Sequence, residues 1–357
     1  MPPIRDLLPY LERIWDSRQL SNHGQVHEEF EQALCEYLGV KYICLFANGT
    51  LALMIALKVL NLKGEVITTP FTSPATAQAI YWNNLTPVFA DINESDLNIN
   101  ISAIESAITE NTCAILPVHI FGIPCDIEAI HKTALNHNLN VVYDAAHCFG
   151  VEVDNQSICN FGDLSVLSFH ATKVFNCIEG GAIVCHDEKT KKQIDALKNT
   201  GFDIDYNLTG YGINAKMNEM QAAFGLCQLK YIDSVIGNRK AADAFYRKLL
   251  KDVKGIKLPG NVNSTKLNYS YFPILINPEE FGCNRDEVHD HLKRKNIITR
   301  KYFFPLVCDY AEFSIYKTVD LPVAQAMAKN ILCIPLFPDI SIEQIETVVA
   351  SIKQLQG

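Results

Sequence analysis

The chain has 357 residues, of which 48% are hydrophobic and 20% are charged, and its formal net charge is -9. This length suffices for one large domain with a smaller one attached. The negative charge disfavours nucleic acids and anionic membrane surfaces as partners, because both would repel the chain. No apolar stretch approaches the roughly 20 residues that a membrane-spanning helix needs, so we expect a cytoplasmic protein with no membrane partner.

The chain contains twelve cysteines, and none of them form a C-x-x-C pair. Several lie within apolar runs, where a thiol behaves as a small hydrophobic group in a reducing compartment. We therefore expect neither disulfides nor a zinc or other metal site. This cysteine usage again favours the cytoplasm.

Short apolar strands alternate with helices over the first half of the chain. We predict strands at 42–46, 65–69, 87–90, 113–118, 140–144, 164–169 and 182–185. We predict helices at 26–38, from the turn at 48–50 as far as 60, and at 75–82, 101–108 and 125–135. This alternation is typical of an α/β fold in which helices cover both faces of a mostly parallel sheet.

The pattern changes after Asn214, where the apolar positions predict one long helical run that reaches the charged stretch near Arg239. Beyond it, the pattern indicates further elements, as expected of a smaller α+β unit. These elements lie at 271–276, 286–294, 323–330 and 341–355. We therefore predict an N-terminal segment with a large domain at 1–245 and a small C-terminal domain at 246–357.

Two polar groups follow predicted strands, at the positions where ligands bind in parallel sheets. In the turn Asn48-Gly49-Thr50, the free amides of a helix N-terminus and a hydroxyl would make a phosphate cradle, although ordinary capping explains the same residues. The turn is neither a Walker loop nor a G-x-G-x-x-G fingerprint. Asp144 ends a buried strand, where it either caps the next helix or faces a protonated heterocyclic nitrogen.

Lys173 lies on a polar turn between two predicted strands, and the pair Gly180-Gly181 allows the chain to reverse tightly after it. Taken alone, such a lysine is usually a solvated surface charge. Its position after the Asn48-Gly49-Thr50 turn and Asp144 favours a second interpretation. A phosphate cradle, an acid for a pyridinium nitrogen and an imine-forming lysine are the parts that a pyridoxal 5′-phosphate enzyme must supply.

The sequence resembles the DegT/DnrJ/StrS family of pyridoxal phosphate-dependent sugar aminotransferases over essentially its whole length. The matching stretches are Asn48-Gly49-Thr50 with Ala52-Leu53, Gly64 to Ile67, Asp144-Ala145-Ala146-His147, Lys173 with Glu179-Gly180-Gly181, and Gly212 to Met217. The resemblance implies a fold type I aminotransferase. Such a fold has a large domain with a mostly parallel mixed sheet flanked by helices, and a smaller C-terminal α+β domain.

The resemblance also implies a role for each matching residue. Lys173 and Asp144 would be catalytic, because Lys173 holds the cofactor as an imine and then moves a proton, while Asp144 pairs with the pyridine nitrogen. His147 would lie beside the ring hydroxyl. The cofactor phosphate would contact Gly49, Thr50, Leu51 and Ser168, and Asn214 would reach the phosphate of the neighbouring subunit. The implied protein is a homodimer with shared active sites, whose cofactor alternates with pyridoxamine phosphate.

Some positions depart from the family pattern. Many members carry an aromatic residue that stacks on the cofactor ring, and the corresponding position here is Ser73; Phe71 is a candidate substitute. Relatives often have a histidine where this chain has Val307 after Phe304-Pro305-Leu306. His170, next to the lysine turn, is a polar contact or a structural residue, and we favour the structural role.

Within the family, the motifs are closest to the viosamine-forming enzymes, which use L-glutamate to aminate dTDP-4-dehydro-6-deoxy-D-glucose. The expected role is therefore in the synthesis of O-antigen or another surface glycan. Amination at carbon 3 and a UDP-linked sugar remain alternatives. A sugar dehydratase is disfavoured because that branch of the family replaces the lysine by histidine. A non-catalytic regulator has no need of both Asp144 and Lys173.

Overall fold

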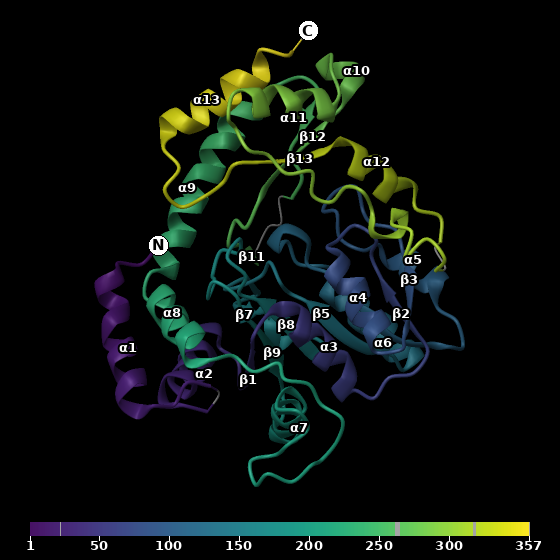
Figure 1. Cartoon of the computed structure of the whole chain (residues 1–357). Coiled ribbons are helices and arrows are strands. Elements are labelled where there is room, and N and C mark those ends of the chain that lie inside the picture. The colour runs from purple at the N-terminus through teal and green to yellow at the C-terminus, as the bar shows by residue number, and fades with distance from the viewer. Residues whose placement is uncertain (22, 261–264, 317–318, 357) are drawn as a thin grey trace.

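The computed structural model describes residues 1–21, 23–260, 265–316 and 319–356. Its larger unit is built on a seven-stranded sheet with the order β1-β9-β8-β5-β4-β2-β3 (Figure 1). The strands are β1 (Tyr42–Phe46), β2 (Glu65–Thr68), β3 (Thr86–Phe89), β4 (Thr112–Leu116), β5 (Asn140–Asp144), β8 (Leu164–Ser168) and β9 (Gly181–Cys185). Each begins and ends within two residues of its predicted bounds.

The sheet is mixed because one strand runs against the others. Neighbours in the series β3, β2, β4, β5 and β8 are parallel, whereas β9 is antiparallel to both β8 and β1. It follows that β1 points in the same direction as β8, so six strands end at the same edge of the sheet. The predicted α/β fold with a mostly parallel mixed sheet is confirmed.

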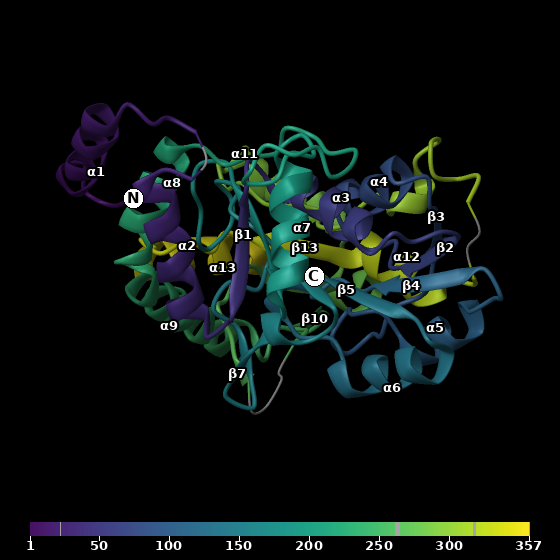
Figure 2. The ribbon, with the colours of Figure 1, turned by 90° about the horizontal axis from the view of Figure 1, so that it is seen from below.

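Three helices form the layer on one face of the sheet. Phe46 and Val142 point to this face and belong to the same core cluster as side chains of all three helices. These helices are α3 (Gly49–Val59), α4 (Pro74–Trp82) and α7 (Glu188–Lys198). Figure 2 shows α3 and α4 on one side of strands β4 and β5, with α5 and α6 on the other side.

The opposite face is covered by two helix pairs. Leu45 faces the pair α2 (Gln25–Leu38) and α8 (Glu219–Leu229) near one edge of the sheet. The other half of this face packs against α5 (Ile101–Ala107) and α6 (Ile127–His137). Burial on both faces explains why the interior residues of the strands are mostly apolar.

The smaller unit has its own sheet and core. Its antiparallel strands are β10 (Ile256–Lys257), β12 (Phe272–Ile276) and β13 (Ile331–Ile334), in the order β10-β12-β13. Side chains of three helices share a core cluster with these strands. The helices are α9 (Ile232–Leu250), α11 (Arg285–Arg294) and α13 (Ile342–Lys353).

The long helical run predicted after Asn214 is wrong in one respect, since it is two helices with a break at Lys230 and Tyr231. The packing partner changes across the break, since α8 packs on α2 while the later turns of α9 enter the core of the smaller unit. The predicted division after residue 245 falls within α9. That division remains a prediction.

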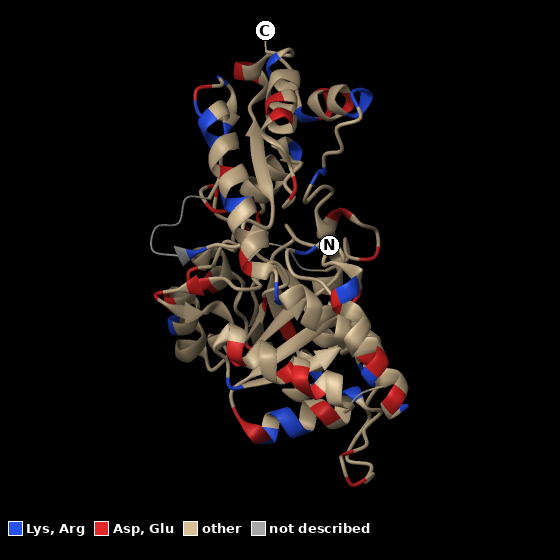
Figure 3. Ribbon diagram, turned by 90° about the vertical axis from the view of Figure 1, so that its left-hand side faces the viewer, with Lys and Arg blue, Asp and Glu red and all other residues tan. Residues whose placement is uncertain are grey.

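The remaining elements are short or peripheral. They are α1 (Ile4–Ser17), α10 (Pro278–Phe281), α12 (Pro322–Asn330), three 3-10 turns (Ile120–Gly122, Ile158–Asn160 and Val307–Asp309) and a small sheet of β11 (Thr265–Lys266), β6 (Glu152–Val153) and β7 (Gln156–Ser157). Among the described residues, no helix has the length and apolar character required to span a membrane. Acidic and basic residues are interspersed over the helices (Figure 3).

Candidate active site

Three of the predicted site segments meet at the carboxyl edge of the large sheet. Asp144 is the last residue of β5 and pairs with Val166 of the neighbouring β8, two residues before Ser168. Gly181 pairs with Ser168 on one side and with Phe46 on the other. The ends of β5, β8 and β1 therefore bring Asp144, Ser168 and the turn after Phe46 together.

Asp144 is a buried carboxylate held by two hydrogen bonds. Its Oδ2 accepts from the hydroxyl of Thr76 in α4 at 2.8 Å, and its Oδ1 accepts from the amide of Ala146 at 3.1 Å. Burial raises the pKa of Asp144, whereas these two hydrogen bonds and the positive charge of Lys173 act in the opposite direction. Such an acid gains from a cationic neighbour, as a protonated ring nitrogen would be.

Lys173 lies on the turn after β8, and its side chain is partly exposed. Desolvation lowers its pKa to about 8, although the negative charges of Asp144 and Cys148 act to raise it. The charge of Lys173 in turn lowers the pKa of His147. Asp144 ends β5 and the lysine turn follows the neighbouring parallel strand β8, so Lys173, Asp144 and His147 lie at the same edge of the sheet. At pH 7 roughly a tenth of an amine with this pKa is uncharged and nucleophilic, far more than at the usual value near 10.5.

His147 is a buried, neutral imidazole. Its Nδ1 accepts a hydrogen bond from the amide of Phe121 at 3.1 Å, so the proton of the neutral ring is on Nε2. Burial, followed by the charge of Lys173, lowers the pKa of His147 well below its ordinary value. The rings of Tyr271 and Phe303 pack against it, with centroids 5.0 and 6.2 Å away. His147 can therefore donate a hydrogen bond from Nε2 without becoming charged.

The turn before α3 has the form of an anion cradle. Asn48 caps the helix by accepting from the amide of Leu51 at 2.9 Å, so that amide is engaged, while the amides of Gly49 and Thr50 precede the first intrahelical bond. A Cβ on Gly49 would lie 3.0 Å from that of Ser168. Glycine at this position therefore keeps space between the helix N-terminus and the Ser168 hydroxyl.

Gly181 packs directly against the backbone of the cradle turn. A Cβ added there would lie 2.7 Å from the carbonyl carbon of Asn48 and from the amide nitrogen of Gly49. Because both contacts are with backbone, no side-chain movement could relieve them. The glycine after the lysine turn thus sets the position of the phosphate-binding turn.

Asn214 stands apart from the buried residues. It is exposed, and its neighbour Ala215 accepts a hydrogen bond from the amide of Ala47, at the start of the cradle turn. The structure thus places Asn214 on the outer side of the turn. Its predicted contact with a neighbouring subunit remains a prediction.

The positions that depart from the family pattern are mostly structural. Ser73 accepts a hydrogen bond from the amide of Ala75 and caps α4. The ring of Phe71 is fully buried between those of Phe121 and Phe303, with centroids 6.4 and 5.8 Å away. Phe71 is thus a core residue, and the structure gives no support to a role in stacking on the cofactor.

Val307 and His170 also have local roles. Val307 is fully buried, and its amide donates to the carbonyl of Pro70 at 2.9 Å. His170 is exposed, with Nδ1 2.8 Å from the Thr172 hydroxyl and Nε2 3.6 Å from a carboxylate oxygen of Glu179. These contacts brace the lysine turn, in agreement with the structural role that we favour.

Two contacts at the site were missed by sequence reasoning. The Thr76 hydroxyl orients Asp144, and the Phe121 amide fixes the tautomer of His147. The only signal for Thr76 was its place after the strand β2, near the N-terminus of α4. Phe121 gave no signal, because its backbone and not its side chain makes the contact.

Comparisons with known proteins agree with this geometry. A model of the DegT/DnrJ/EryC1/StrS aminotransferase family matches residues 4–353. The chain is 47% identical to the dTDP-4-amino-4,6-dideoxy-D-glucose transaminase of Shigella dysenteriae, over 100% of this chain and 97% of the relative. It is 46% identical to the Escherichia coli protein of the same name, over 99% of this chain and 95% of the relative.

Solved structures show the same likeness. DesI, crystallised in the presence of its TDP-sugar product, matches with a TM-score of 0.95 and 34% identity, over 99% of this chain and 90% of DesI. PseC of Helicobacter pylori, an aminotransferase involved in the biosynthesis of pseudoaminic acid, has a TM-score of 0.91 and 29% identity, over 98% and 96%. This chain therefore belongs to the DegT/DnrJ/EryC1/StrS aminotransferase family, and it is a sugar-nucleotide aminotransferase.

Proposed function

We propose that this enzyme transfers the amino group of L-glutamate to carbon 4 of dTDP-4-dehydro-6-deoxy-D-glucose, giving dTDP-4-amino-4,6-dideoxy-D-glucose. The observation that carries the proposal is that the turn bearing Lys173, whose pKa is about 8, follows the strand next to the one that ends in the buried carboxylate Asp144. The choice of sugar is supported by the two relatives above 45% identity, which are named for this product. The product would serve the synthesis of O-antigen or another surface glycan.

The residues fit pyridoxal phosphate, on which enzymes of this family depend. The amides of Gly49 and Thr50 and the hydroxyl of Ser168 would hold the phosphate, in the space that Gly49 leaves open. Asp144 would meet the pyridine nitrogen, and His147 would donate from Nε2 to the ring hydroxyl. When bound, the cofactor supplies a conjugated ring that accepts the electron pair released when a carbon–hydrogen bond breaks.

Each protein group has a distinct task in this proposal. Asp144 keeps a proton on the ring nitrogen, and the Thr76 hydroxyl holds its carboxylate in place. Lys173 would hold the cofactor, and its amine, when free of the cofactor, would take the proton from the α-carbon of the donor. A pKa near 8 suits this task, because an amine at the usual value near 10.5 would be almost wholly protonated and unable to act as a base.

A homodimer with shared active sites is part of the proposal. Segment 199–218 carries Asn214 and several apolar side chains that are exposed in a single chain. They are Phe202, Ile204, Tyr206, Leu208 and Tyr211. Contiguous exposed apolar side chains favour association. A second copy bound here would place Asn214 of one chain near the cofactor phosphate of the other chain. A cytoplasmic location agrees with the free thiol state of the cysteines.

Two other substrates remain candidates within the same reaction class. Amination at carbon 3 and a UDP-linked sugar are favoured only by more distant relatives, such as the Acidithiobacillus ferrooxidans 3-aminotransferase of a UDP-sugar at 30% identity. Lys173 disfavours the dehydratase alternative, and its low pKa together with Asp144 disfavours a non-catalytic regulator.

The reaction is tested with purified protein, which should be yellow and change colour when L-glutamate is added. Incubation with keto-sugar nucleotides, followed by mass spectrometry, identifies the acceptor. We expect an amino product from the 4-keto dTDP-sugar. An amino product from a 3-keto isomer and none from the 4-keto sugar would overturn the choice of substrate. A protein that binds no pyridoxal phosphate would overturn the function.

A further inference from the structure

A cavity of about 750 Å³ lies between the lysine turn and the smaller unit. Thr172, the residue before Lys173, lines its inner end together with Tyr271. The ring of Tyr271 also packs against His147, with 5.0 Å between the centroids. The cavity therefore borders the proposed cofactor site, although none of the predicted cofactor contacts lines it.

The walls of the cavity are mainly apolar and come from the smaller unit. Two positively charged side chains interrupt them, Arg239 of α9 and Arg300 before β13. Burial raises the pKa of Tyr271, and Tyr302 and Cys333 raise it further. The positive charges of both arginines act in the opposite direction. Tyr271 and both arginines line the same cavity.

Arg239 has a structural task. It is buried, and its Nη1 donates to the carbonyls of Tyr269, Ser270 and Leu336 at 3.1 to 3.3 Å. It therefore joins the two segments that form the cavity wall. Burial lowers its pKa to about 10, and among the described residues no carboxylate forms an ion pair with it.

Among the described residues, the hydrogen bonds of Arg300 involve only its backbone. Its amide and carbonyl exchange hydrogen bonds with Cys333 of β13, at 3.0 and 2.8 Å, which fixes the place of its Cα. Its guanidinium carbon lies 5.7 Å from the centroid of the Tyr302 ring. Within the described part of the chain, the ion pairs do not include Arg300. Its charged group is thus free to bind an anion inside the cavity.

We propose that this cavity receives the side-chain carboxylate of a dicarboxylic amino donor, and that Arg300 is the residue that selects it. The proposal rests on the aminotransferase function proposed above. A donor held at the cofactor by its amino group has its second carboxylate a few methylene groups away, and Arg300 lines the same cavity as Thr172, the neighbour of Lys173. The planar guanidinium can bind that carboxylate through two hydrogen bonds.

A nucleotide diphosphate is the other anion in the reaction, and the cavity suits it less well. Glu343 also lines the cavity and would repel the multiple charges of a diphosphate. Nη1 of Arg239 is engaged by carbonyls and its buried Nε has no partner among the described residues, whereas Arg300 can offer the whole edge of its guanidinium to an anion.

Calorimetry on the holoenzyme tests the site directly. The probe is glutarate, a five-carbon dicarboxylate with no amino group and therefore no reaction. We expect Arg300→Gln to weaken glutarate binding about tenfold or more, because a charged hydrogen-bond donor is lost. Arg300→Lys should restore part of the affinity. Arg294→Gln, which removes an exposed arginine at the end of α11 outside the cavity, should change nothing.

Kinetics separate this inference from the proposed function. In Arg300→Gln the KM for L-glutamate should rise about tenfold, whereas the slow reaction with L-alanine, which has no second carboxylate, should be unchanged. Equal losses with both donors, or unchanged glutarate affinity, would overturn the inference while leaving the aminotransferase intact. Loss of dTDP binding in Arg300→Gln with glutarate unaffected would also overturn it. A wild-type enzyme that transaminates neither donor would defeat the proposed function itself.

Discussion

Lys173 and Lys198 are two lysines whose pKa values the same fold shifts in opposite directions. Burial lowers the pKa of Lys173 to about 8, because Asp144 and Cys148 compensate only part of its desolvation. Lys198 is completely buried at the end of α7, but Asp195 and Glu31 outweigh the desolvation and raise its pKa. One lysine is prepared to lose its proton, and the other is locked in its charged form.

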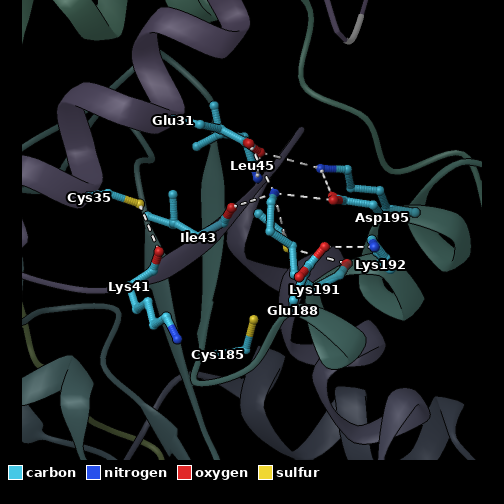
Figure 4. Close-up of polar contacts among 12 residues, drawn as sticks. Glu31, Cys35, Lys41, Ile43, Leu45, Cys185, Glu188, Lys191, Lys192 and Asp195 are labelled. Carbon is cyan, nitrogen blue, oxygen red and sulfur yellow. Dashed lines mark hydrogen bonds and ion pairs between the residues drawn. The ribbon is translucent and has the colours of Figure 1, made fainter. Parts of the chain in front are cut away.

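The environment of Lys198 is a network of ion pairs between layers of the fold. Its Nζ lies 2.6 Å from Asp195 and 3.7 Å from Glu31 of α2. The Nζ of Lys191 lies 3.1 Å from Asp195 and 3.0 Å from Glu31 (Figure 4). It also donates a hydrogen bond to the carbonyl of Ile43 in β1 at 3.0 Å. The network therefore ties α7 and α2 to the edge of the sheet.

A lysine becomes chemically useful when nearby carboxylates compensate only part of its desolvation. The carboxylates of Asp195 and Glu31 balance the positive charge of Lys198, so its role is structural. Around Lys173 the single carboxylate Asp144 is itself buried and takes hydrogen bonds from Thr76 and Ala146. A cationic ring nitrogen would complete the balance at Asp144, and that arrangement is expected of a cofactor site.

The largest expected effect is that of Lys173→Ala. This variant should lose roughly a thousandfold or more of the turnover, because both the covalent attachment of the cofactor and the proton transfer depend on this amine. The yellow colour of the lysine–cofactor bond should also disappear. Stopped assays and absorption spectra measure both quantities, and an unchanged urea midpoint serves as the control. Retention of the visible band in the variant would show that another lysine binds the cofactor.

Asp144→Asn should lower turnover by roughly a hundredfold, since a neutral amide cannot keep a proton on the ring nitrogen. The matched control is Asp163→Asn, near the opposite end of β5, where the carboxylate accepts from the amide of Val141. That change should leave turnover unaffected. Similar losses in both variants would mean that Asp144 acts only through the stability of the strand.

Lys198→Met should destabilise the fold by about 3 kcal/mol, because Asp195 and Glu31 are left less compensated in a buried place. Turnover per folded molecule should not change. Burial raises the pKa of Asp195, but Lys198 and Lys191 outweigh it and lower the pKa from 3.8 to about 2. The network therefore stabilises the fold above pH 4, and this contribution is lost as the pH falls through about 2.

Urea unfolding measures the effect, with Lys192→Met as the matched control. Lys192 lies on the same helix but pairs with Glu188 on the exposed face. Exposed pairs contribute little, so this control should unfold at the wild-type midpoint. Loss of turnover per folded molecule in Lys198→Met would break the distinction between the two lysines.

The sequence predicted much of this site because parallel strands end at a common edge. Strand periodicity located β1, β5 and β8, and their ends carry the Asn48-Gly49-Thr50 turn, Asp144 and Ser168. Because these strands run parallel in one sheet, the groups at their ends lie along the same edge. The functional assignment came from the resemblance, since each motif alone also had a structural explanation.

Contacts between distant segments were beyond the sequence pattern. The pairs Thr76 with Asp144 and Phe121 with His147 depend on how α4 and the turn after β4 pack, which no local periodicity records. The break between α8 and α9 was missed because apolar spacing continues across it while the packing partner changes. Arg300 gave no signal, because an arginine in an extended segment looks like any surface charge.

Borohydride reduction of the holoenzyme, followed by peptide mapping of every lysine, tests the central claim most directly. Reduction fixes the cofactor to the nitrogen that holds it. The account predicts a phosphopyridoxyl group on Lys173 and an unmodified Lys198, and it predicts that the rate of cofactor attachment to stripped protein rises with pH through about 8. A label on Lys198 or another lysine, with Lys173 unmodified, would contradict it.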